Sequence, residues 1–109
     1  KLKSKIRKKI IKKNMGWCDD VNSVHYNKLV KIKNKLKIKY EKMYRKDDKY
    51  DIVIPIHYNS FNPKKNKGSA IFIHLTKNYN KTLGCVALKK KDILILLRLI
   101  TNKTKIKII

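Results

Sequence analysis

Several features that would place this chain in a familiar class are absent from its sequence. No window approaches the roughly 18 consecutive apolar residues of a membrane-spanning helix, because the longest apolar stretch, Ile93 to Ile100, is interrupted by Arg98. The N-terminal stretch lacks the apolar run of a secretory signal and begins with Lys1, which favours a fragment or a processed chain. With 109 residues and 42% hydrophobic content, we expect one modest core in a single soluble unit, or in a unit anchored by a segment outside this sequence.

Acidic residues and arginine are also scarce. The chain has 30 Lys and Arg against 7 Asp and Glu, a formal net charge of +23, which first suggests a protein that binds nucleic acid. Only three of these cations are Arg, the residue that supplies a bidentate fork for phosphate and guanine, and the lysines are spread over almost every segment. We therefore expect a solvated basic surface without a specific nucleic-acid partner, and a non-enzymatic basic binding module remains the alternative.

The first half of the chain gives weak structural signals. Residues 1–14 place isoleucines among cations, which suits one face of a helix or an edge strand equally. Residues 15–27 mix Gly, Asp, Asn and Ser, and we expect an ordered loop there. Residues 29–44 alternate Lys with apolar residues, a pattern compatible with short strands or with a helix.

The second half gives clearer signals. Residues 51–58 are β-branched and aromatic and predict a strand, and Pro55 places it at a sheet edge or at a bulge. Residues 69–75 are nearly all apolar and predict a strand buried on both faces, with His74 at its far end. Residues 90–100 predict a C-terminal helix, and residues 104–109 alternate like a closing strand. These patterns indicate a mainly β fold.

A histidine and a cysteine in this half are spaced to form a nucleophilic pair. Cys85 follows His74 by eleven positions, which places imidazole and thiol at adjacent ends of neighbouring strands. Cysteine suits acyl transfer because its thiolate is a strong nucleophile and an imidazole can accept its proton. Gly84 permits a tight turn, so that backbone N–H groups near Cys85 face the oxyanion of a tetrahedral intermediate. The alternative is a structural cysteine beside a hydrogen-bonded core histidine, and the spacing alone does not separate the two.

Three blocks of sequence carry a resemblance to a known family. They are Gly-Trp-Cys-Asp-Asp at residues 16–20 followed by Tyr26-Asn27, then Gly-Ser-Ala-Ile-Phe-Ile-His at residues 68–74, and Thr-Leu-Gly-Cys-Val-Ala-Leu at residues 82–88. Together, and in this order, they resemble the catalytic domain of L,D-transpeptidases of the YkuD type, from about Met15 to the C-terminus. The chain departs from the commoner family motif at Leu83 and Ala87, where the family has His and then Arg or Asn.

The resemblance implies a β-sandwich core and an activity. We expect residues 1–109 to form the C-terminal part of a single catalytic domain in which Cys85 is the nucleophile and His74 the general base, its other ring nitrogen held by a backbone carbonyl. A peptidoglycan stem peptide would acylate the cysteine at a diaminopimelate–D-alanine bond, release D-alanine and pass to an amine, without a cofactor or a metal. Hydrolysis of the thioester by water, as in a peptidase, is the alternative. A periplasmic or otherwise extracytoplasmic location in bacteria is implied as well.

The loop at residues 16–20 supplies candidates for substrate binding. Asp19 and Asp20 are predicted to contact a substrate ammonium or to orient a catalytic group, with capping of the loop as the alternative. Trp17 is predicted to line the substrate cleft or to be a core aromatic.

Cys18 is the other cysteine, and a disulfide with Cys85 is an alternative to two free thiols. The carboxylates next to Cys18 disfavour a thiolate there, whereas the lysines at 89–91 favour one at Cys85. A zinc site made from these cysteines with His25 and His74 is disfavoured, because the chain has no Cys-x-x-Cys knuckle.

Overall fold

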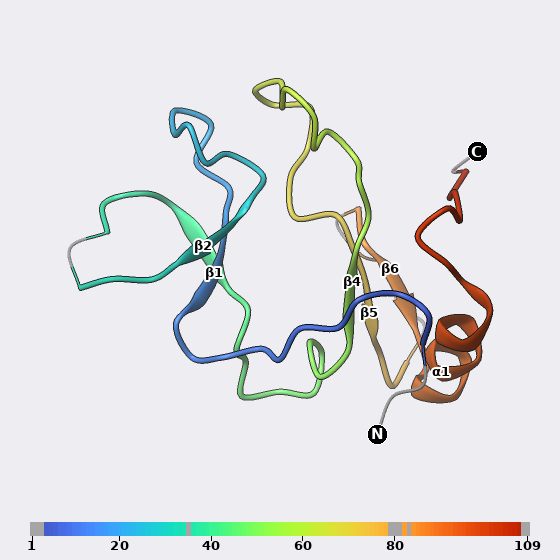
Figure 1. Cartoon of the computed structure of the whole chain (residues 1–109). Coiled ribbons are helices and arrows are strands. Elements are labelled where there is room, and N and C mark those ends of the chain that lie inside the picture. Colours follow the sequence, from blue (N-terminus) through green and yellow to red (C-terminus); the bar gives the residue numbers. More distant parts are fainter. Residues whose placement is uncertain (1–3, 35, 79–81, 83, 108–109) are drawn as a thin grey trace.

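The computed structural model describes residues 4–34, 36–78, 82 and 84–107, which form two three-stranded sheets and a C-terminal helix (Figure 1). The first sheet has the order β2-β1-β3 and is antiparallel, with β1 at Met15–Cys18, β2 at Leu29–Lys31 and β3 at Tyr40–Lys42. The second has the order β4-β5-β6, with β4 at Val53–Pro55, β5 at Phe72–Leu75 and β6 at Val86–Leu88. Helix α1 spans Lys90–Leu99. The mainly β fold with a C-terminal helix is confirmed.

Strand β5 is the central strand of the second sheet and serves two cores. All four of its residues are buried, as their continuous apolar pattern predicted. Phe72 belongs to the inter-sheet core, which also contains Met43 and Tyr50 and packs against residues of β1. Ile73 and Leu75 belong to a second core. Side chains alternate along a strand, so His74 points to the same side as Phe72, toward the first sheet.

Helix α1 covers the other side of the second sheet. It buries Ile93 and Leu97, and Ile93 packs with the β5 residues of the second core. Asp92 lies in its first turn and Arg98 in its last, which complements the helix dipole at both ends. The chain is therefore layered as sheet, sheet and helix, and the layers appear in that order in Figure 1.

Strand β6 brings the Gly-Cys block beside β5. The two strands are parallel, with Ile73 opposite Val86 and His74 opposite Ala87. Cys85 immediately precedes β6, so it lies at the end of this strand next to the start of β5. Strand β4 pairs only with β5 among the described strands, which confirms the edge position predicted from Pro55.

Several predicted boundaries are corrected by the structure. The strand expected at 51–58 is limited to β4, and the one expected at 69–75 begins only at Phe72, because Ala70 has a left-handed backbone with φ 55° that no strand accommodates. Within the ambiguous region 29–44, residues 29–31 and 40–42 form strands. The closing strand predicted at 104–109 is wrong over residues 104–107, which pair with no strand, while residues 108 and 109 lie outside the described part.

Strand β1 lies inside the segment predicted to be a loop. Its Gly16 allows two neighbouring strands to approach closely, since a Cβ there would lie 3.0 Å from Cδ2 of Tyr40 and 3.2 Å from Cγ1 of Ile32. Tertiary contact of this kind, which local propensity does not encode, selects the strand.

Candidate active site

Residues from both sheets line one pocket of about 420 Å³ that contains the predicted nucleophile and base. We call it the His74–Cys85 pocket. Its lining residues come from the end of β1, from β3, from the segment before β4, from β5 and from the segments preceding β5 and β6. They are Asp19, Glu41, Lys49, Tyr50, Ser69, Ala70, His74, Thr82 and Cys85.

His74 is held with one ring nitrogen fixed. It is 2% exposed, and its Nδ1 lies 2.9 Å from the carbonyl oxygen of Leu75. A carbonyl oxygen can only accept, so Nδ1 carries the hydrogen and donates it. In the neutral ring the proton-accepting atom is then Nε2. His74 lines the same pocket as Cys85.

Cys85 lies at the start of β6 with its thiol hydrogen bonded. The Sγ atom donates to the carbonyl oxygen of Ala70 at 3.3 Å, and the Cys85 carbonyl accepts a hydrogen bond from the hydroxyl of Thr82. Gly84 has φ 105°, a backbone conformation that L side chains rarely adopt, and this allows the turn that leads into β6. The thiol therefore stands in a fixed environment at the pocket wall.

Tyr50 forms a buried wall of the pocket between the imidazole and a carboxylate. Its ring centroid lies 5.9 Å from that of His74, and its hydroxyl donates to Glu41. Burial, and then the hydrogen bond to Glu41, raise the pKa of Tyr50, so the phenol stays protonated. Arg45 lies over the same ring at 5.1 Å and forms a two-pronged pair with Asp47 at 2.9 and 2.7 Å, which lowers the pKa of Asp47 to about 2.

The two aspartates of the loop have different environments. Asp19 is exposed and lines the His74–Cys85 pocket. Asp20 does not line it, because its carboxylate accepts the backbone N–H groups of Asn22 at 3.0 Å and Lys39 at 3.2 Å. These hydrogen bonds, that of Asn22 first, lower the pKa of Asp20. Of the two predicted substrate contacts, only Asp19 is free to face a ligand from this pocket.

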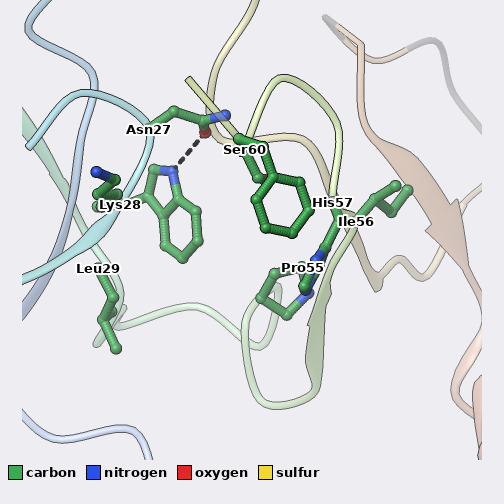
Figure 2. Close-up of a pocket in the computed structure, with 9 residues that line it drawn as sticks. Asn27, Lys28, Leu29, Pro55, Ile56, His57 and Ser60 are labelled. Atoms are coloured by element: carbon green, nitrogen blue, oxygen red, sulfur yellow. Dashed lines mark hydrogen bonds between the residues drawn. The ribbon is translucent and has the colours of Figure 1, made fainter. Parts of the chain in front are cut away.

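Trp17 lies at a second pocket, of about 240 Å³, shown in Figure 2. Its indole Nε1 donates to the side-chain oxygen of Asn27 at 2.9 Å, the dashed line of Figure 2, and its ring meets Phe72 edge-on with centroids 5.0 Å apart. Trp17 thus packs against the inter-sheet core, as one of its two predicted roles requires, and lines a surface pocket separate from the His74–Cys85 pocket. The predicted substrate contact stays a prediction and refers to this second pocket.

The remaining candidates are placed as follows. Cys18 is completely buried and Cys85 partly buried, and both are free thiols. Among the described residues, no group of three or more His, Cys, Asp and Glu side chains is arranged to hold a metal ion. Within the same residues, no helix is long and apolar enough to cross a membrane.

Of the residues that line the His74–Cys85 pocket, sequence reasoning named Asp19, His74 and Cys85 as candidates and missed the others. Ser69, Ala70 and Thr82 lie inside the quoted blocks and were accessible to it. Glu41, Lys49 and Tyr50 were not, because they come from segments whose lysine-rich pattern gave no local motif. Glu41 could have been noticed from composition alone, because it is the sole glutamate of a chain with net charge +23.

Comparison with known proteins gives a family. No curated protein and no solved structure matches the chain. The model of the L,D-transpeptidase catalytic domain family, YkuD, matches residues 9–108. This match covers both sheets, the helix and every residue that lines the His74–Cys85 pocket. The chain belongs to the L,D-transpeptidase catalytic domain family.

Proposed function

We propose that this protein is a cysteine acyltransferase that acts on peptidoglycan stem peptides, with Cys85 as nucleophile and His74 as general base. The observation that carries the proposal is the pairing of these two side chains in one pocket, with Nδ1 of His74 bound to the Leu75 carbonyl. Family membership supports the same chemistry. The site of action is then outside the cytoplasm, where peptidoglycan lies.

The first half-reaction forms a thioester. Nε2 of His74 accepts the Cys85 proton, and the thiolate attacks the carbonyl carbon of the diaminopimelate–D-alanine bond. Backbone N–H groups at the turn formed by Gly84 stabilise the oxyanion of the tetrahedral intermediate. The C–N bond then breaks, the imidazolium returns its proton to the leaving amine, and D-alanine departs.

The second half-reaction transfers the acyl group. The amine of a second stem peptide attacks the thioester carbonyl and gives a proton to His74, and the C–S bond breaks to regenerate the Cys85 thiol. Water in place of the amine would give hydrolysis at the same site. Product analysis with and without an added amine separates these outcomes, because only transfer consumes the amine.

The charges of the pocket wall support a substrate that carries both signs. Asp19 and Glu41 supply carboxylates and Lys49 an ammonium group, in a chain that is otherwise strongly basic. Asp19 and Glu41 together are two of only seven acidic residues. The diaminopimelate side chain offers an ammonium and a carboxylate, and we propose that Asp19 binds the ammonium.

Labelling with a carbapenem, followed by peptide mass spectrometry, tests the nucleophile. We expect a covalent adduct on the peptide that contains Cys85, its loss in Cys85→Ala, and its retention in the matched control Cys18→Ala. His74→Gln should retain the thiol but slow labelling, because its side chain cannot accept the proton. An absence of adduct on the folded wild-type protein, or an adduct on Cys18 alone, would overturn the assignment.

A further inference from the structure

Asn27 is a buried amide whose hydrogen-bonding capacity is fully used. Asn27 is 4% exposed. Its Oδ1 accepts from the indole of Trp17 at 2.9 Å and from the backbone N–H of Ala70 at 3.1 Å. Its Nδ2 donates to the carbonyl oxygens of Tyr58 at 2.9 Å and Asn59 at 2.8 Å. An amide makes two donor and two acceptor contacts of this kind, so no other side chain of this size supplies the same set.

One of these four contacts leads directly to the nucleophile. The residue whose N–H is bound by Asn27 is Ala70, and the carbonyl oxygen of Ala70 accepts the thiol hydrogen of Cys85 at 3.3 Å. Ala70 has φ 55°, a left-handed backbone that is uncommon for alanine and that the surrounding contacts must maintain. The Asn27 side chain accepts the N–H of Ala70, so it anchors the residue whose carbonyl accepts the thiol hydrogen.

The thiol in this structure is oriented toward a backbone oxygen. For acylation its proton must pass to Nε2 of His74, and the distance over which the sulfur moves depends on where Ala70 holds it. The position of Ala70 therefore affects where the sulfur stands in the resting protein.

We propose that Asn27 is a positioning residue that holds the Ala70 carbonyl and thereby the resting position of the Cys85 sulfur. Asn27 lies in the loop between β1 and β2 of the first sheet, whereas Cys85 immediately precedes β6 of the second sheet. The contact between Asn27 and Ala70 thus joins a loop of the first sheet to the segment that precedes β5. The acylation measurement that tests this inference rests on the proposed function. The thiol-alkylation measurement does not.

The experiment compares two asparagines in the same backbone conformation. Asn27 has φ 58° and Asn59 has φ 53°, and glycine takes either without strain. The Asn59 side chain hydrogen bonds within its own loop, to the backbone of Lys64 and Gly68, and the bond that Asn59 accepts from Asn27 uses its backbone carbonyl, which glycine keeps. Asn27→Gly and Asn59→Gly therefore each remove a loop-fixing amide, but only the first releases Ala70.

Two rates are measured on each full chain. For Asn27→Gly we expect the carbapenem acylation rate constant at saturation to fall about 10- to 100-fold with little change in the dissociation constant, because a sub-ångström to 1 Å displacement of a reacting atom has effects of this order. We expect iodoacetamide to alkylate Cys85 faster than in wild type, because the thiol has lost its acceptor. Cys18, which is completely buried, should stay protected. Asn59→Gly should resemble wild type in both rates and in the protection of Cys18.

Two results would overturn the inference. One is a loss of acylation in Asn59→Gly as large as the loss in Asn27→Gly. The other is faster alkylation of both Cys18 and Cys85 in folded Asn27→Gly. Each of these results would indicate only a loosened fold. If Asn27→Gly does not fold, Asn27→Asp is used to test the proposal. One aspartate oxygen can still accept the Ala70 N–H, whereas the other oxygen faces the carbonyls of Tyr58 and Asn59, to which it cannot donate. This variant should retain the acylation rate within a few fold despite lower stability, and a loss as large as that expected for Asn27→Gly contradicts the proposal. If wild type itself is not acylated, the proposed function fails, and the alkylation pattern alone decides the role of Asn27.

Discussion

Replacing Tyr50 with Phe isolates the hydrogen bond between the buried phenol and Glu41. Tyr50 is 5% exposed, and its hydroxyl donates to the Glu41 carboxylate. A hydrogen bond to a charged group contributes about 1.5–3 kcal/mol. Tyr50→Phe should therefore lower the free energy of unfolding at neutral pH by about this amount, while keeping the ring that meets Phe72 edge-on at 5.7 Å.

The difference between the two proteins should also depend on pH. Burial, and then the hydrogen bond to Glu41, raise the pKa of Tyr50 above its ordinary value of 10.0. Between the ordinary and the raised pKa the unfolded chain has lost the phenol proton and the folded chain has kept it. The stabilisation is therefore complete below the ordinary pKa and declines as pH rises above it, by about 1.4 kcal/mol per pH unit.

Urea unfolding of both proteins, followed by circular dichroism from about pH 7 to about pH 11, measures this difference. Subtracting one protein from the other removes the titration of the lysines, which both share. The advantage of wild type should be constant up to the ordinary tyrosine pKa and then shrink. A difference that is absent at neutral pH, or that stays constant over the whole range, would refute a buried phenol that donates to Glu41.

Two further changes test the loop and the turn. In wild type, the two backbone amide protons bound by Asp20 should titrate in NMR spectra with a midpoint below 3.8, the ordinary aspartate pKa. The lowered pKa keeps the carboxylate charged and the loop stabilised until pH falls through that pKa. Asp20→Asn should abolish the titration, and a wild-type midpoint at the ordinary pKa would contradict the assigned hydrogen bonds. Gly84→Ala should cost about 1–3 kcal/mol of unfolding free energy through backbone strain at φ 105°, since the nearest atom to the added Cβ is at an ordinary 3.4 Å. Thermal unfolding measures that cost, and a variant as stable as wild type would show that the turn does not need glycine.

The sequence predicted those parts of the fold whose burial is written in a local pattern. The unbroken apolar run around His74 predicted β5, and the leucines and isoleucines after residue 90 predicted α1 to within one residue at its C-terminal end. Strand β1 was not predicted, because glycine has a low strand propensity and the strand at Gly16 depends on the close approach of Tyr40. The lysine-rich alternation of residues 29–44 fits a helix and a strand equally, and only pairing with β1 decides it.

The site was predictable to the same extent. The family blocks contain His74, Gly84 and Cys85 together with Ala70 and Thr82, which bind Cys85, but they do not show the contacts that these residues make. Ala70 shows the limit most clearly, because an alanine at φ 55° contradicts the residue preference that sequence reasoning depends on. Its conformation is imposed by contacts with residues far along the chain, and those contacts exist only in the folded protein.

The burial of β5 on both faces has a consequence for regulation. Three of its four residues belong to two separate cores, Phe72 to one and Ile73 and Leu75 to the other, so we expect the backbone amides of β5 to exchange with solvent at the rate of global unfolding. His74 is then expected to lie in the most slowly opening part of the molecule. Any control of the proposed reaction is therefore expected to act through the segment that carries Cys85, which is only partly buried.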